Sequence, residues 1–124
     1  MKNSTLILLL FTVLLSCKKN NTGGVAVVKA HVGHHSQSVK GATVYVKFNT
    51  KEAPVSPENN YDLKIEGEAV EDHVHIQGLR YGDYYLYAVG YDSILNQVVK
   101  GGVPLKINWG DRKKEVEIDI PVTE

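Results

Sequence analysis

Gly41-Ala42-Thr43-Val44-Tyr45-Val46-Lys47-Phe48 alternates between two kinds of side chain with a period of two residues. Its even-numbered residues are all apolar, whereas its odd-numbered residues after Gly41 are polar or aromatic. Successive side chains of an extended chain point to opposite faces, so this pattern is typical of a strand with one buried face. The stretch Glu115–Ile120 repeats the alternation more strictly, with apolar residues against acidic ones. Together these two stretches predict an all-β fold.

Five further stretches have strand character, because they are rich in β-branched and aromatic residues and are bounded by turn residues. They are residues 25–32, 61–65, 74–79, 84–89 and 98–107. Glycines and Pro104 interrupt the last of them, which predicts a bulge or an edge strand. Residues 50–60 are expected to form a surface loop, and acidic residues 66–72 a solvated turn. Short strands at this spacing favour a β-sandwich, and no stretch has the period of an amphipathic helix.

Two segments resemble a known family. Val39-Lys40-Gly41-Ala42-Thr43-Val44-Tyr45-Val46 and Ile76-Gln77-Gly78-Leu79-Arg80-Tyr81-Gly82-Asp83-Tyr84-Tyr85-Leu86 are similar to the motifs of the carboxypeptidase regulatory-like family. The resemblance implies a single seven-stranded Greek-key β-sandwich of the transthyretin-like (prealbumin-like) type over residues 25–124. It also implies that Leu79, Tyr84 and Leu86 fill the core. Domains of this family usually serve as accessory modules, and these motifs carry no chemistry.

The beginning of the chain resembles the signal peptide of a bacterial lipoprotein. Met1-Lys2-Asn3 is basic, residues 6–15 are almost wholly apolar, and Leu14-Leu15-Ser16-Cys17 is similar to a lipobox. The apolar run is about half of the ~20 residues that span a bilayer. The resemblance implies removal of residues 1–16 and a diacylglycerol on the sulfur of Cys17. Residues 17–24 would then be the lipidated cysteine and a flexible tether, and Lys18 favours the outer membrane over the inner membrane.

Composition bears on disulfide bonding, on the kind of partner and on the number of domains. Cys17 is the only cysteine, so no disulfide stabilises the domain. The formal net charge is zero, which gives no reason to expect nucleic acid as a partner. Removal of residues 1–16 leaves 124 − 16 = 108 residues, enough for one domain.

The histidines are the only unusual set of metal-ligand residues in the chain. His73 and His75 are one residue apart on a predicted strand, so they project from the same face, about 6–7 Å apart at the backbone. That spacing suits one metal ion, and imidazole ligands favour zinc, copper or nickel. His34 and His35 are expected in the first hairpin turn and would add ligands if that turn lies nearby, as would His31. The alternative is that all five are polar residues tolerated on an exposed face.

Tyrosine is the preferred aromatic residue, with seven Tyr against two Phe. Tyr45, Tyr85 and Tyr87 fall on the outward faces of their predicted strands, where half-exposed rings could contact a protein or glycan. The alternative is cross-strand packing of the rings against one another.

Two enzyme families share the transthyretin-like fold. Intradiol dioxygenases bind iron through two tyrosines and a His-x-His pair, which His73-Val74-His75 resembles, with Tyr45 or Tyr61 as the tyrosines. This chain has no residues to spare for the elements that build their substrate pocket. Hydroxyisourate hydrolases end in Tyr-Arg-Gly-Ser, whereas this chain ends in Pro121-Val122-Thr123-Glu124. An enzyme is therefore the remote alternative, and no catalytic residue is predicted.

Three functions follow in order of expectation. The first is a lipid-anchored module of the cell envelope that binds a protein or glycan partner without catalysis and needs no cofactor. The second is a periplasmic lipoprotein that binds a transition metal through its surface histidines. The third is an enzyme of the transthyretin-like fold.

Overall fold

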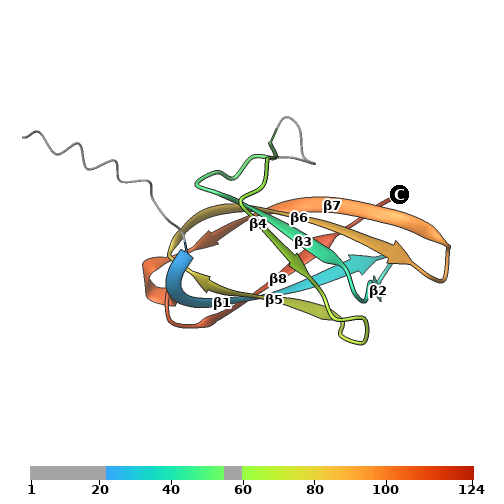
Figure 1. Ribbon diagram of the computed structural model, residues 1–124, viewed down its shortest axis with the longest axis horizontal. Helices are drawn as coiled ribbons and strands as arrows, with labels where there is room; N and C mark the ends of the chain where they lie inside the picture. Colours follow the sequence, from blue (N-terminus) through green and yellow to red (C-terminus); the bar gives the residue numbers. More distant parts are fainter. Residues whose placement is uncertain (1–21, 55–59) are drawn as a thin grey trace, which may run out of the picture.

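The computed structural model describes residues 22–54 and 60–124, and it is an all-β protein (Figure 1). Its strands form two four-stranded sheets, which lie against each other. Within the described ranges the one helical element is the short 3-10 turn η1 (Trp109–Asp111). No helix in the described part of the chain is long and apolar enough to cross a membrane. The predicted signal peptide, Cys17 and residues 18–21 lie outside the described residues.

The first sheet is built around the long strand β1 (Thr22–His34). β1 pairs antiparallel with β2 (Gln37–Ser38) and β5 (His73–Leu79), and parallel with β8 (Glu115–Pro121). The register places His31 opposite His73 and Lys29 opposite His75. This register brings the histidines of two strands to one region of the sheet.

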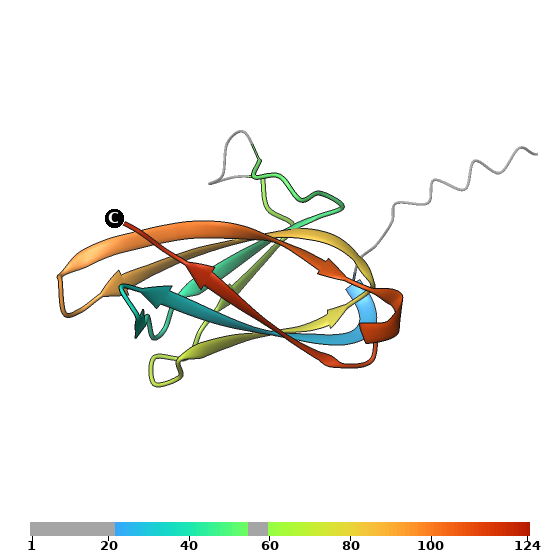
Figure 2. The same cartoon turned by 180° about the vertical axis from the view of Figure 1, so that it is seen from behind.

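The second sheet has the order β4-β3-β6-β7. Its strands are β3 (Thr43–Phe48), β4 (Leu63–Glu66), β6 (Gly82–Asp92) and β7 (Gln97–Ile107). β7 is the last strand in this order and pairs with β6 in unbroken register, so the edge-strand alternative is right and the bulge is absent. Backbone hydrogen bonds between Lys100 of β7 and Thr123, beyond β8, join the two sheets (Figure 2).

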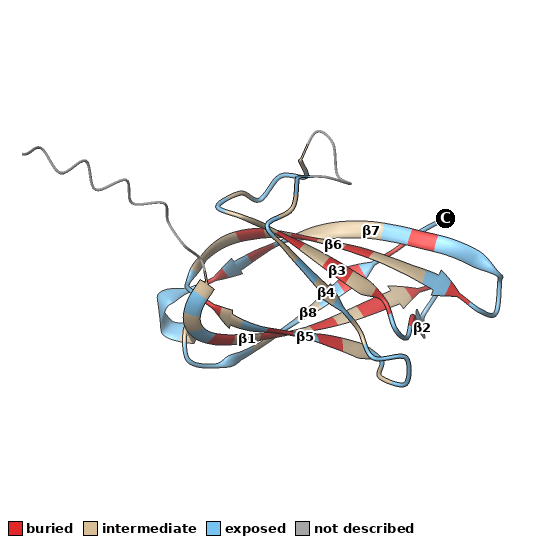
Figure 3. Ribbon diagram, in the orientation of Figure 1, coloured by how far each residue is buried: buried red, intermediate tan, exposed pale blue. Residues whose placement is uncertain are grey.

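The core lies between the sheets and follows the predicted alternation (Figure 3). Val44 and Val46 of β3 are fully buried, and so are Leu86 and Tyr84 of β6. The Tyr84 hydroxyl donates a hydrogen bond to the carbonyl oxygen of Arg80 at 2.6 Å, so this large ring is buried with its polar group satisfied. Each of the seven predicted strands is present, and the two-residue β2 is an addition to them.

The start of the domain differs from the prediction. β1 begins at Thr22, not at Val25, so Gly23 and Gly24 are part of the first sheet and do not belong to a tether. Gly23 has a positive φ of 85°, and a Cβ on Gly24 would overlap the backbone of Leu79. The two glycines therefore allow β1 to approach β5 closely at a bulge where both Thr22 and Ala26 pair with Leu79.

Candidate metal centre

His73 and His75 lie at the beginning of β5 and project from the outward face of the first sheet. Val74 and Ile76, which alternate with them, are buried in the core. The two imidazole rings lie with their centroids 4.6 Å apart in an edge-to-face arrangement. The strand therefore holds both rings on one face, as the His-x-His spacing predicts.

Two acidic residues immediately before β5 complete the arrangement. The Nδ1–H of His73 donates a hydrogen bond to Oδ1 of Asp72 at 2.8 Å. The other ring nitrogen, Nε2, lies 3.5 Å from Oε2 of Glu71. In metal sites a carboxylate commonly orients a ligating histidine through one nitrogen, which leaves the lone pair of the other nitrogen for the metal. In this site Asp72 orients His73 through Nδ1, and Nε2 of His73 faces Glu71.

The distances suit a small divalent ion. Bonds of about 2.1 Å from zinc to nitrogen and oxygen, at tetrahedral angles, place neighbouring ligand atoms roughly 3.4 Å apart. Nε2 of His73 and Oε2 of Glu71 already have this separation. The ligand atoms of Glu71, His73 and His75 all lie within 4.8 Å of one another, so small side-chain rotations would bring three ligands to one ion.

His31 supplies a fourth imidazole from the neighbouring strand. It is paired with His73 across the β1–β5 ladder, and their ring centroids are 5.8 Å apart. His31 is thus the only predicted ligand outside β5 that the fold brings to the His73–His75 pair. It would need a larger rotation than Glu71 to share an ion with them.

The local field favours a cation. The hydrogen bond from His73 lowers the pKa of Asp72 below its usual value, although partial burial acts in the opposite direction. Asp72 is therefore ionised at neutral pH, beside Glu71. From the sequence these two residues were predicted to be part of a solvated turn. Their position directly before the His-x-His pair is the signal that could have identified them.

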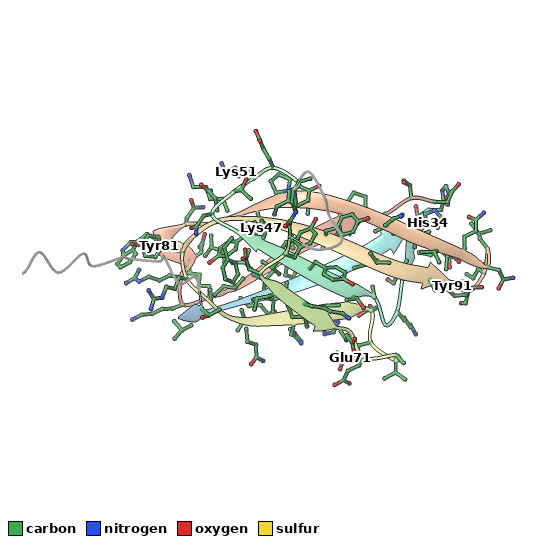
Figure 4. The ribbon with its side chains drawn as sticks, turned by 45° about the horizontal axis from the view of Figure 1, so that its top comes forward. His34, Lys47, Lys51, Glu71, Tyr81 and Tyr91 are labelled. Carbon is green, nitrogen blue, oxygen red and sulfur yellow. The ribbon has the colours of Figure 1, made fainter. Side chains whose placement is uncertain are left out.

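His34 and His35 do not belong to this centre, which corrects the prediction that they would add ligands if the hairpin lay nearby. β1 continues through His34, and the first turn is the two-residue loop of His35 and Ser36, both with positive φ. His34 is three residues beyond His31 on the opposite face of β1, and it is only 2% exposed. Figure 4 shows it well apart from Glu71.

His34 instead links three parts of the chain. Its Nδ1 lies 2.7 Å from Oδ2 of Asp92, at the end of β6, and its Nε2 lies 2.8 Å from Oε2 of Glu124. Because a carboxylate accepts and does not donate, both ring nitrogens must carry a proton, so His34 is an imidazolium. The hydrogen bond to Asp92 raises the pKa of His34, and the same bond lowers the pKa of Asp92. Both nitrogens are thus engaged, and neither is available to a metal.

Tyr45, Tyr85 and Tyr87 are half-buried on the outward face of the second sheet, and two of these rings, Tyr45 and Tyr87, pack with each other and with Tyr61. Tyr45 and Tyr87 are cross-strand partners, and Tyr61 lies 5.5 Å from Tyr45 and 5.8 Å from Tyr87 between ring centroids. The ring of Tyr85 lies so close over Gly102 that a Cβ on residue 102 would collide with it. The alternative of cross-strand packing therefore holds for Tyr45 and Tyr87.

Comparison of the chain with models of known protein families gives no match, and comparison with curated proteins gives none either. The function is therefore inferred from the geometry of the site itself.

Proposed function

We propose that this chain is a lipid-anchored β-sandwich protein of the cell envelope that binds a divalent transition-metal ion at Glu71, His73, His75 and His31. Zinc, copper and nickel are the ions that suit this set of imidazole and carboxylate ligands. The observation that carries the proposal is the Asp72–His73–Glu71 relation. One nitrogen of His73 is held by a carboxylate, and the other faces a second carboxylate at a distance suited to metal bonds.

The exposure of the centre favours binding over catalysis. His75 and the Glu71 carboxylate face solvent on an open sheet surface. Catalytic metals need an open coordination position inside a shaped cavity that excludes water. A binding site on an exposed strand suits sequestration or transfer of the ion.

The remaining parts of the proposal come from the sequence. The family resemblance supports a transthyretin-like, carboxypeptidase regulatory-like topology for the sandwich. The lipobox supports lipidation at Cys17 and a location at the membrane of the envelope, with the outer membrane favoured. Association with an envelope protein or glycan through Tyr45, Tyr85 and Tyr87 stays a prediction.

The metal site is tested by calorimetric titration of a soluble chain from Lys18 to Glu124, which contains all eight strands. Zinc, copper and nickel salts are each titrated into the wild type, into the double variant His73→Ala/His75→Ala and into His35→Ala. His35 is an exposed histidine outside the centre, so His35→Ala is the matched control. We expect one ion per chain, bound by the wild type and His35→Ala and not by the double variant. Equal binding by all three proteins would refute the site.

The anchor is tested separately in cells that express the full chain. Cys17→Ser removes the sulfur that the lipobox resemblance assigns to the lipid. We expect the wild type to incorporate labelled fatty acid and the variant to accumulate as an unlabelled, unprocessed precursor. Normal processing of Cys17→Ser would contradict lipidation at this position.

A further inference from the structure

The end of the domain where β1 begins carries exposed aromatic and apolar side chains that the core does not use. Trp109 is 59% exposed, Tyr81 is 46% exposed and Val25 is 64% exposed. The rings of Tyr81 and Trp109 pack edge to face with their centroids 4.8 Å apart. These residues line one shallow hollow of about 150 Å³. The group formed by Val25, Tyr81 and Trp109 is here called the aromatic end.

Cations surround the aromatic end. Arg80, Arg112 and Lys113 line the same hollow, and the guanidinium of Arg112 lies 3.7 Å from the centre of the Trp109 ring. The nearby acid Asp111 is paired with Lys114 at 3.6 Å. The three cations therefore give this end a local positive charge, although the whole chain has a net charge of zero.

The chain enters the domain at this same end. Figures 1 and 2 both show the start of β1 beside η1, and the Arg80 guanidinium lies next to Gly23. Cys17 precedes Thr22 by five residues, and five residues of extended chain span at most about 17 Å. A lipid on Cys17 would therefore hold the aromatic end next to the bilayer.

We propose that the aromatic end docks on the anionic headgroup surface of the membrane that holds the lipid of Cys17. This inference rests on the lipid anchor of the proposed function. Tyr and Trp rings prefer the boundary between hydrocarbon and water, and basic side chains are attracted to anionic headgroups. Together with the acyl chains they make an anchor of several weak contributions, which is how lipidated proteins are held stably and in a defined orientation.

A second exposed apolar region, at the tip of the β6–β7 hairpin, does not fit this role. Ile94 and Leu95 are exposed there, but residues 91–98 contain no lysine or arginine. Tyr91 marks this tip in Figure 4, at the opposite end of the molecule from Tyr81. β6 has eleven residues, which extend over roughly 36 Å, so this tip lies far from the point where the tether enters the domain. Glu71 also lies away from Tyr81 in Figure 4, so docking would leave the metal centre open to the aqueous side.

The test uses Trp109 as its own reporter, because it is the only tryptophan of the chain. A chain beginning at Cys17 is coupled through its single thiol to a maleimide lipid and reconstituted in vesicles of phosphatidylethanolamine and phosphatidylglycerol. Flotation with the vesicles establishes that the chain is attached. We expect the emission of Trp109 to shift to the blue and to be quenched by brominated acyl chains, more strongly than in neutral phosphatidylcholine vesicles.

The matched control moves the reporter to the opposite end in the variant Trp109→Phe/Ile94→Trp, which should show neither shift nor quenching. Arg80→Gln/Lys113→Gln should reduce the difference between anionic and neutral vesicles. An attached chain with Trp109 as solvent-exposed as in the detached chain would overturn the inference, and so would equal quenching of the two reporters.

The lipid itself is examined independently by mass spectrometry of the chain exported by cells. A native chain without lipid on Cys17 would overturn the proposed anchor and this inference with it. A lipidated native chain with an unshielded Trp109 would overturn the docking inference alone.

Discussion

Replacing Asp72 by asparagine separates the orientation of His73 from the metal ligands themselves. The side chain keeps its size, but the charged acceptor of the His73 Nδ1–H becomes neutral. Nε2 of His73 then loses both part of its basicity and its fixed direction toward Glu71. Loss of such an outer partner typically weakens metal binding by about 10–100-fold. We expect Asp72→Asn to weaken zinc binding by roughly 30-fold, the middle of this range.

The consequence can be worked out as a shift in thermal stability. A ligand at 100 times its dissociation constant stabilises the native state by about 2.7 kcal/mol, and a 30-fold weaker ligand at the same concentration by about 0.9 kcal/mol. For a domain of this size, each 1 kcal/mol raises the melting temperature by about 4–8 °C. Zinc should therefore raise the wild-type melting temperature by about 11–22 °C and that of the variant by about 4–7 °C.

The assay is a pair of melting curves, with zinc and with a chelator, for the wild type, Asp72→Asn and Glu68→Gln. Glu68 is an exposed acid in the same turn, so its variant removes one negative charge without touching His73. Without zinc, Glu68→Gln should melt at the wild-type temperature and Asp72→Asn at or slightly below it, because Asp72→Asn loses the charged acceptor of the exposed His73 hydrogen bond. The zinc shift is therefore measured for each protein against its own melting temperature with the chelator. An undiminished zinc-induced rise of the melting temperature in Asp72→Asn would refute the role of Asp72 in orienting His73. If Glu68→Gln lowers this rise equally, the loss is a general effect of charge.

Three further predictions concern groups outside the metal centre. The pKa of His34 is raised above 6.5, so its stabilising contribution is complete below pH 6.5 and is lost as the pH rises through the raised value. Urea unfolding should show this loss of stability in the wild type and not in His34→Gln, whereas an identical pH dependence would contradict the imidazolium. Tyr84→Phe should lower the free energy of unfolding by about 0.5–1.5 kcal/mol, because the part-buried hydrogen bond from its hydroxyl to the carbonyl oxygen of Arg80 is lost, and an unchanged urea midpoint would count against that bond. Burial, with smaller contributions from Tyr85 and Tyr87, raises the pKa of Tyr61 to about 12, and its buried hydroxyl has no hydrogen-bond partner in the described structure. Tyr61→Phe should therefore leave stability equal or higher and remove a tyrosine that titrates near pH 12 from an ultraviolet titration. A marked loss of stability would contradict the absence of a hydrogen-bond partner for the Tyr61 hydroxyl.

Much of the fold can be predicted from local sequence patterns. The alternation of β3 and β8 predicts strands because burial of one face requires a period of two, and no competing helical period is present. The same rule places His73 and His75 on one outward face. The same rule would have predicted that His34 is buried, because it has the same parity in β1 as the buried Val28, Ala30 and Val32. The hairpin was predicted to start before His34, and this boundary error turned a buried residue into a candidate ligand.

The partners of these residues were not predictable from local patterns. Asp92 and Glu124 are 58 and 90 residues away from His34 in sequence, and only the packing of the two sheets brings them to it. His31 meets His73 because β1 and β5 pair in one particular register, and a shift by one residue would turn one of them to the core. The aromatic end is likewise assembled from β1, the β5–β6 turn and η1.

The sequence alone therefore determined the strands, the face of each side chain on them and the resemblance to a lipoprotein signal, because these depend on neighbours a few residues apart. The tertiary structure decided which histidines share a site, which one is buried as an imidazolium, and which end of the domain the chain enters. Those properties depend on strand register and sheet packing, which are set by the burial of the whole core and not by any single segment.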